Sequence, residues 1–180
     1  MRIRKAVPED TAGIAKVHVD SWRSTYSGII SERFLEGMSY RERENRWHDI
    51  FDQAQPGSCV YVAEAENGEI VGFASGGSER SGKYGDFQSE LYAIYLLKEI
   101  QGQGIGRSLF RKAARNLVEQ GFSSMLVWVL ADNREARAFY ESFGPSRVDS
   151  QPIDIDGDRF EEVAYGWRNL RDVKVFHDKP

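Results

Sequence analysis

Three glycines stand at alternate positions, Gly102, Gly104 and Gly106, directly before an apolar stripe that predicts a helix. The start of a helix exposes unpaired backbone N–H groups and a partial positive charge, so it binds anions readily. Glycines in front of it allow a phosphate to reach the backbone, whereas a simple turn would need one glycine and avoid the entropic cost of three. We therefore predict a phosphate-binding loop, with a glycine-rich turn that holds no ligand as the alternative. The predicted loop comprises Gln101, Gly102, Gln103, Gly104, Ile105, Gly106 and Arg107.

Two well-known phosphate-binding loops do not match this spacing. A Walker loop requires Lys and then Ser or Thr after its last glycine, and Arg107 stands where the Lys is needed. A dinucleotide fingerprint requires G-x-G-x-x-G, and Leu109 occupies the third glycine position when counted from Gly104. Asp132 could act as the ribose-binding acid. However, a dinucleotide-binding loop follows the first strand of a doubly wound sheet, whereas three antiparallel-looking strands precede this loop. Nicotinamide nucleotide binding is therefore not favoured.

Composition restricts the class of protein further. The 180 residues, 41% of them hydrophobic, suit one globular domain with a substantial core. The net charge of −4 argues against a nucleic-acid-binding domain, although it allows a local basic groove. There is no apolar signal core and no run near the ~18 apolar residues of a membrane span. The lone Cys59 suits a reducing cytosol, and the three histidines have no metal-ligand spacing. We expect a cytoplasmic protein without nucleic acid, membrane or metal partners.

The loop must be positioned by the elements around it. Before it, the apolar segment 88–97 predicts a buried strand; after it, a stripe from Ile105 to Val118 predicts an amphipathic helix that Gly121 ends. A buried strand over 124–130 and a short helix over 132–144 follow. The other predicted elements are a strand at 2–7, helices at 8–28 and 39–51, a hairpin over 59–77 turning at Asn67-Gly68, and strands at 146–155 and 159–167.

This order of elements is strand, helices, three strands, helix, strand, helix and two strands. It contains no internal repeat and no linker. It predicts one mixed α/β domain over residues 1–168, followed by a polar C-terminal tail over residues 169–180.

The stretch LYAIYLLKEIQGQGIGRSLF resembles the acyl-CoA-binding motif of the GNAT superfamily of N-acetyltransferases. In that family a strand is followed by Gln/Arg-x-x-Gly-x-Gly/Ala and a helix, and Gln101, Gly104 and Gly106 occupy the three places. The resemblance implies the GNAT fold, with a mixed central sheet of about seven strands flanked by helices. Lys98 departs from the family, which often has proline there.

A second stretch, NREARAFYESFG, is similar to the second motif of the same family, with Asn133, Phe139-Tyr140 and Gly144 in the matching places. Pro145 departs from the aromatic or aliphatic residue usual after that glycine. SWRSTY, followed by GII, further resembles a bacterial subgroup whose members are mostly of unassigned substrate. Because both motifs lie on the expected elements, the resemblance covers nearly the whole chain.

The resemblance implies acetyl-CoA as co-substrate. The amides of residues 102–107 would receive its pyrophosphate, and Arg107 either adds a contact or is a solvated first-turn residue. The strand at Ile94, Tyr95 and Leu96 would pair with the pantetheine arm through its backbone. Such pairing requires a strand that splays from its neighbour, because buried backbone groups must otherwise be satisfied within the sheet. A free N–H there would also polarise the thioester carbonyl.

The family uses the tyrosine at the place of Tyr140 as the acid that protonates the leaving thiolate. A phenol with a pKa of about 10 and a thiol of about 8.5 exchange a proton without a large penalty. Tyr140 could instead be a core residue on an apolar helix face. Asn133, seven positions earlier on the same face, contacts the CoA or only caps the helix.

The general base is a separate question. Several GNAT enzymes carry a glutamate where Glu90 opens the central strand, acting directly or through water. Two-residue alternation places Glu90, Tyr92, Ile94 and Leu96 on one face of the strand. The Glu90 carboxylate could therefore point along that face toward the thioester. A surface carboxylate, with water as the base, is the alternative.

The amine acceptor is expected between the first helices and the last strands. Trp22, Arg23 and Tyr26 are the candidate substrate-binding residues. The two aromatic residues fit the core equally well, and Arg23, off the apolar stripe, could bind a substrate carboxylate or nothing. We expect an enzyme that moves an acetyl group to a primary amine of a small molecule or peptide in a ternary complex. The alternative is a non-catalytic acyl-CoA-binding regulatory domain of the same fold. The sequence does not decide the oligomeric state, although GNAT proteins often form homodimers.

Overall fold

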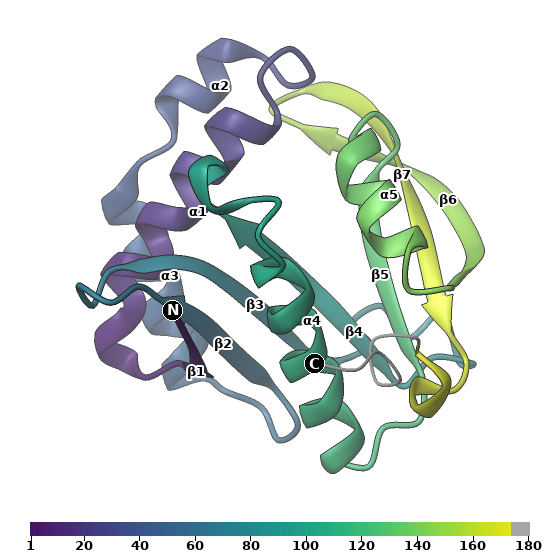
Figure 1. Cartoon of the computed structure of the whole chain (residues 1–180). Coiled ribbons are helices and arrows are strands. Elements are labelled where there is room, and N and C mark those ends of the chain that lie inside the picture. Colours follow the sequence, from purple (N-terminus) through teal and green to yellow (C-terminus); the bar gives the residue numbers. More distant parts are fainter. Residues whose placement is uncertain (174–180) are drawn as a thin grey trace.

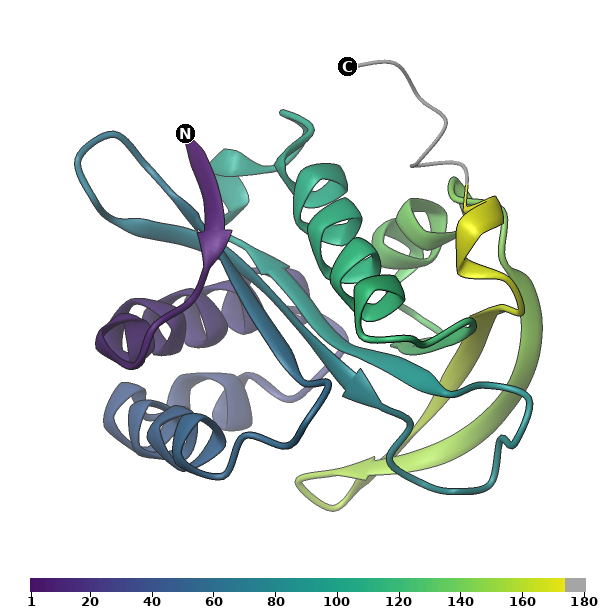
Figure 2. The same cartoon turned by 90° about the horizontal axis from the view of Figure 1, so that it is seen from below.

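A computed structural model describes residues 1–173 as one seven-stranded sheet between two layers of helices (Figures 1 and 2). The strand order is β1-β2-β3-β4-β5-β7-β6. Neighbouring strands are antiparallel except β4 and β5, which are parallel. The mixed α/β fold of about seven strands is therefore confirmed.

The first half of the chain builds one edge of the sheet and the helices on one face. Ser39 begins α3 by accepting a hydrogen bond from the Glu42 amide at 3.2 Å, and Gly68, at φ 86°, forms the turn between β2 and β3. Helix α2 was not expected from the sequence. The elements are β1 (Arg2–Lys5), the 3-10 turn η1 (Pro8–Asp10), α1 (Thr11–Thr25), α2 (Glu32–Gly37), α3 (Tyr40–Asp52), β2 (Cys59–Glu64) and β3 (Ile70–Ser78).

The second half carries the predicted loop and motifs. The helix after the glycines runs from Ile105 and ends before Gly121, which has φ 93°. The elements are β4 (Ser89–Leu96), η2 (Lys98–Ile100), α4 (Ile105–Glu119), β5 (Met125–Leu130), α5 (Arg134–Glu141), β6 (Ser146–Ile155), β7 (Asp158–Trp167) and η3 (Leu170–Asp172).

Apolar faces of the helices close the two sides of the sheet. Helix α4 packs on β2, β3 and β4, with Leu109, Phe110 and Leu117 completely buried. Its Phe110 ring stacks on Phe143, just after α5, with centroids 4.2 Å apart. On the opposite face (Figure 2), Trp47 of α3 packs edge-on against Phe73 of β3 at 5.0 Å.

The parallel strands β4 and β5 pair over a short length and then part. Their register covers Ser89–Met125, Glu90–Leu126 and Leu91–Val127, although β4 continues to Leu96 and β5 to Leu130. The remaining edge of β4 is therefore not paired with β5. Backbone groups on that edge are available to a ligand.

The C-terminal boundary differs from the prediction. Leu170 and Val173 are fully buried in the main core, so the domain continues past residue 168. Asn169 begins η3 by accepting a hydrogen bond from the Arg171 amide at 3.1 Å. The polar composition of this segment concealed its two buried apolar side chains. The rest of the predicted tail, residues 174–180, lies outside the described residues.

Gly166→Ala should destabilise the fold by about 1–3 kcal/mol, the usual cost of overpacking. A Cβ at Gly166 would lie 2.4 Å from the Phe87 ring and 2.7 Å from Val148, in a strand that is paired on both sides. Urea unfolding measures the loss of free energy. Gly85→Ala is the matched control, because a Cβ there meets nothing within 4 Å. Equal stability of the two variants would contradict the tight packing at Gly166.

Candidate active site

A cavity of about 620 Å³ opens where β4 and β5 part. Both strands line it, together with the glycine loop, the C-terminal part of α1, the α5 region and β6. Thirteen of the predicted site residues therefore lie around one space: Trp22, Tyr26, Glu90, Ile94, Tyr95, Leu96, Gln101, Gly102, Gly104, Gly106, Arg107, Asn133 and Tyr140.

The three glycines of the loop serve two purposes. Gly102 and Gly104 have φ of 74° and 79°, a left-handed conformation that glycine adopts without strain. Gly104 is also the N-cap of α4, and no side chain caps the first amides of that helix. Gly106 has an ordinary φ; a Cβ there would lie 3.1 Å from Leu96 and 3.3 Å from Phe139, so this glycine allows α4 to approach its neighbours closely.

The other loop residues divide between the cavity and the outside. Gln101 lines the cavity, and its amide nitrogen donates to the Leu96 carbonyl at 3.3 Å, on the strand beside the gap. Arg107 lines it too, with its guanidinium 5.1 Å from the Phe143 ring centre. Gln103 and Ile105 do not line it: Gln103 donates to the Glu99 carbonyl, and Ile105 packs toward the core.

A β-bulge overturns the predicted alternation of β4. The register passes from Gly76–Leu91 to Ser75–Ala93, so Tyr92 is an extra residue. Leu91 and Leu96 consequently both face α4, which residues five apart in a regular strand cannot do. Glu90 therefore points to the opposite face from Leu96, and the prediction that Glu90, Tyr92, Ile94 and Leu96 share a face was wrong.

Three tyrosines surround the inner part of the cavity. Tyr140 is 6% exposed, and within residues 1–173 its hydroxyl makes no hydrogen bond. Burial, and secondarily the Tyr26 phenol, raise the pKa of Tyr140 above its ordinary value. Burial likewise raises the pKa of Tyr26 and Tyr95, whose hydroxyls are 3.5 Å apart. The pKa of the Tyr140 phenol therefore exceeds that of a thiol by more than the ordinary values indicate, and all three phenols keep their protons.

Asn133 caps the N-terminus of α5 and also lines the cavity. Its side-chain oxygen accepts from the Ala136 amide at 3.1 Å, which begins α5, and the residue is buried against the cavity. Burial raises the pKa of Tyr26, and the nearby Asn133 side chain partly offsets this increase. Asn133 thus lies at the start of α5 and beside the Tyr26 phenol.

Glu90 is buried and fully engaged by Arg80. The Arg80 side chain donates to both carboxylate oxygens, its Nε at 3.1 Å from Oε2, and its backbone N–H adds a bond of 3.3 Å. This pairing raises the pKa of Arg80. The guanidinium also lies 4.4 Å from the Tyr92 ring centre. Both carboxylate oxygens of Glu90 are therefore already occupied by Arg80.

Among the predicted acceptor residues, Arg23 lies elsewhere. Trp22 and Tyr26 line the cavity with ring centres 4.9 Å apart. The Arg23 guanidinium instead donates to the carbonyls of Leu35 and Met38 at 3.0 and 2.9 Å, at the C-terminal end of α2. It fixes α2 against α1, and it could not be assigned from sequence because α2 itself was not predicted.

Several cavity residues had no signal in the sequence. Arg80 comes from a polar loop, and Trp128 from a strand expected to be wholly buried.

In the part of the chain that the structure describes, no helix is long and apolar enough to cross a membrane. Nor, among residues 1–173, do three His, Cys, Asp or Glu side chains gather as a metal ion would require.

His18 lies behind the cavity in an aromatic cluster. Its ring stacks on Tyr95 at 5.3 Å and lies 5.8 Å from both Trp22 and Phe73. Its Nδ1 is buried without a hydrogen-bond partner. Burial, and then the charges of Arg43 and Arg46, lower the pKa of His18 to about 3. The imidazole is therefore neutral in the fold.

Comparisons with known proteins identify a family and relatives of this chain. The model of the acetyltransferase (GNAT) family matches residues 17–144. The chain is 45% identical over 173 residues to the Bacillus subtilis protein named uncharacterized N-acetyltransferase YuaI, covering 96% of each chain. It is 31% identical over 159 residues to an uncharacterized N-acetyltransferase of Archaeoglobus fulgidus, covering 83% of this chain and 96% of that one.

A solved structure gives the same result for the fold. The PaiA N-acetyltransferase of Thermoplasma acidophilum, crystallised in complex with coenzyme A, has a TM-score of 0.69 and 25% identity, covering 90% of this chain and 96% of that chain. The chain belongs to the GNAT family of acetyltransferases. It is an acyl-CoA-dependent N-acetyltransferase, an enzyme class that acts on amines of small molecules or peptides.

The buried imidazole of His18 should make the fold sensitive to acid. Between its ordinary pKa of 6.5 and its folded value of about 3, the unfolded chain binds a proton that the folded chain lacks. The free energy of unfolding therefore falls as the pH is lowered, by about 2 kcal/mol between pH 7 and pH 5 from this residue alone. His18→Phe should remove that part of the loss, as measured by urea unfolding at both pH values.

His48→Gln serves as the control, because the His48 side chain on α3 is half exposed. Comparison of the two variants separates the effect of the buried imidazole from the loss of a histidine as such. An unchanged acid-induced loss in His18→Phe would show that the imidazole is already protonated or solvated in the fold.

Proposed function

We propose that this enzyme transfers an acetyl group from acetyl-CoA directly to a primary amine, with both substrates bound together. The observation that carries the proposal is the early end of β4–β5 pairing, which leaves a cavity bounded by uncapped helix amides and by Tyr140. Glycine loop, free strand edge and buried phenol thus lie in one continuous space. Direct attack needs these three features and no covalent intermediate on the protein.

Binding of the donor is assigned to the loop and the strand. The amides of residues 102–107 receive the pyrophosphate at the uncapped N-terminus of α4, where the helix dipole favours negative charge. Arg107 supplies a positive charge from the same wall. The backbone of Ile94, Tyr95 and Leu96 binds the pantetheine arm along the edge that β5 leaves. Asn133 holds the start of α5 against this arm.

The chemistry requires a neutral amine, a stabilised oxyanion and a proton for sulfur. The amine nitrogen attacks the thioester carbon, and a backbone N–H of β4 donates to the carbonyl oxygen as negative charge develops there. The carbon–sulfur bond then breaks, and Tyr140 gives its proton to the departing sulfur. The raised pKa of Tyr140 keeps the phenol protonated and available as a donor. The proton lost by the amine restores the phenol through solvent.

Glu90 is assigned the removal of the amine proton through water. Arg80 occupies both carboxylate oxygens, so a water molecule at the cavity side is a better direct acceptor than the carboxylate itself. Glu90 then orients that water and stabilises the positive charge it acquires. Trp22 and Tyr26 form the apolar wall on the acceptor side.

Gly104→Val should weaken CoA binding about tenfold or more, because a β-branched residue at φ 79° is strained by roughly 1–3 kcal/mol and moves the loop. Isothermal titration calorimetry with CoA measures this. Gly68→Val is the matched control: it introduces similar strain at φ 86° in the distant β2–β3 turn and should leave CoA affinity unchanged. An unaltered dissociation constant in Gly104→Val would place the pyrophosphate elsewhere.

Tyr140→Phe should lower kcat by about 10²-fold or more, the usual contribution of a positioned acid, while CoA affinity changes little. Release of free CoA thiol from acetyl-CoA and a panel of amines gives the rate. Tyr84→Phe is the control and should keep full activity, because Tyr84 is a half-buried residue outside the cavity lining whose hydroxyl donates to Asp149. Full turnover by Tyr140→Phe would remove this phenol from the mechanism.

A further inference from the structure

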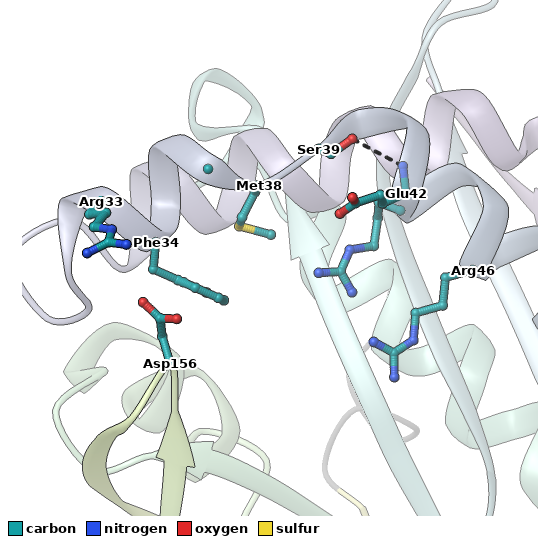
Figure 3. Close-up of a pocket in the computed structure, with 9 residues that line it drawn as sticks. Arg33, Phe34, Met38, Ser39, Glu42, Arg46 and Asp156 are labelled. Atoms are coloured by element: carbon teal, nitrogen blue, oxygen red, sulfur yellow. Dashed lines mark hydrogen bonds between the residues drawn. The ribbon is translucent and has the colours of Figure 1, made fainter.

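A second cavity, of about 330 Å³, lies beside the first and is lined by arginines (Figure 3). It is formed by α2, the segment leading to α3, the first turns of α3, and the turn of the β6–β7 hairpin. Arg33 comes from α2, Arg43 and Arg46 come from α3, and Asp156 comes from the hairpin turn. Figure 3 shows Arg46 and Arg33 at opposite ends of this space, with Met38 between them.

In the described part of the chain, these three arginines take part in no salt bridge. Among residues 1–173, no carboxylate lies within 4 Å of the guanidinium of Arg33, Arg43 or Arg46, and Arg43 is half-buried. Burial, and then the neighbouring Arg46, lower the pKa of Arg43. The two carboxylates of the lining, Glu42 and Asp156, leave one net positive charge in the cavity. Guanidinium groups placed in this way suit a bidentate anion such as carboxylate or phosphate.

The arginine cavity adjoins the acetyl-transfer cavity along the pair of rings Trp22 and Phe34. Phe34 lines the arginine cavity and Trp22 the other, and their ring centres are 6.3 Å apart. Ile155 lines the transfer cavity, while its neighbour Asp156 lines the arginine cavity. Met38 packs in the same apolar cluster as Tyr26. A group bound at the arginines is therefore next to the wall where the acceptor is assigned.

We propose that the arginine cavity binds an anionic group of the acceptor, so that the substrate is an amine whose molecule also carries a carboxylate or phosphate. This inference rests on the proposed function, because it uses the same acceptor wall. Arg43 and Arg46 bind the anion, and Arg33 closes the other end. The aromatic pair Trp22 and Phe34 contacts the apolar stem between anion and amine. A polyamine such as spermidine is disfavoured because its other ammonium groups would face the arginines.

The first arm of the test uses matched amines. Turnover is compared for ω-amino acids from β-alanine to 6-aminohexanoate against their amides, for phosphoethanolamine against ethanolamine, and for spermidine. For at least one ω-amino acid, or for phosphoethanolamine, kcat/KM should exceed that of the matching uncharged compound by about tenfold or more. The carboxylate and phosphate series tell the two anion sources apart. Equal or faster turnover of the amides or of spermidine overturns the inference and leaves the acetyltransferase proposal intact.

The second arm locates the preference. The double variant R43Q/R46Q should lose it through a higher KM at similar kcat, with CoA affinity unchanged. R41Q removes one charge from the same helix outside the cavity and should retain the preference. A similar loss in R41Q would point to overall charge and contradict the assignment.

The third arm does not depend on turnover. Phosphoethanolamine and 6-aminohexanoate are titrated calorimetrically into protein already saturated with CoA, which occupies the glycine loop. Binding that weakens about tenfold in R43Q/R46Q but not in R41Q supports the subsite even if no amine in the panel reacts. Absent binding, or binding that the double variant leaves unchanged, overturns it. Failure of the subsite and failure of the transfer chemistry are thus distinguishable.

Discussion

Hydrogen bonding between the parallel strands β4 and β5 stops after Leu91 and Val127, and the site depends on this early end. A fully paired sheet would bury every backbone group of β4 and leave no edge for a ligand. Several features hold the strands apart beyond that point. Tyr92 bulges out of the ladder with β3, Phe139 of α5 packs beside Gly106 of α4, and the Phe110 ring of α4 stacks on Phe143, just after α5. The cavity is therefore a consequence of packing on both sides of the gap.

Burial sets the electrostatics of the site. The phenols of Tyr26, Tyr95 and Tyr140 all have raised pKa values because they lie in an apolar wall, so each is a hydrogen-bond donor at working pH. The charged groups stand at the margins: Glu90 is neutralised by Arg80 on one side, and the arginines of α3 lie behind Trp22 on another. A neutral centre with charged margins suits a reaction in which a neutral amine meets a thioester.

Periodicity and motif spacing predicted most of the framework. The glycine loop, the amphipathic α4 and the Asn67-Gly68 hairpin have strong local signals, and the structure confirms these elements. The bulge at Tyr92 has no local signal, because it depends on pairing with β3, and it reversed the expected face of Glu90. Arg23 was misassigned because its partners belong to α2, a helix of six residues with a weak pattern. Likewise, the spacing of residues in the sequence could predict neither the Arg80–Glu90 contact nor the arginine cavity, because each depends on how separate segments of the chain pack together.

Amide hydrogen exchange, measured residue by residue with and without acetyl-CoA, tests the central claim most directly. If the free edge of β4 and the start of α4 bind the donor, the amides of Ile94 and Leu96, which face away from β3, and those of residues 102–107 will gain protection when acetyl-CoA is added, while the already paired amides of 89–91 will change little. Unchanged exchange in both segments, with protection appearing elsewhere on the sheet, would contradict the account.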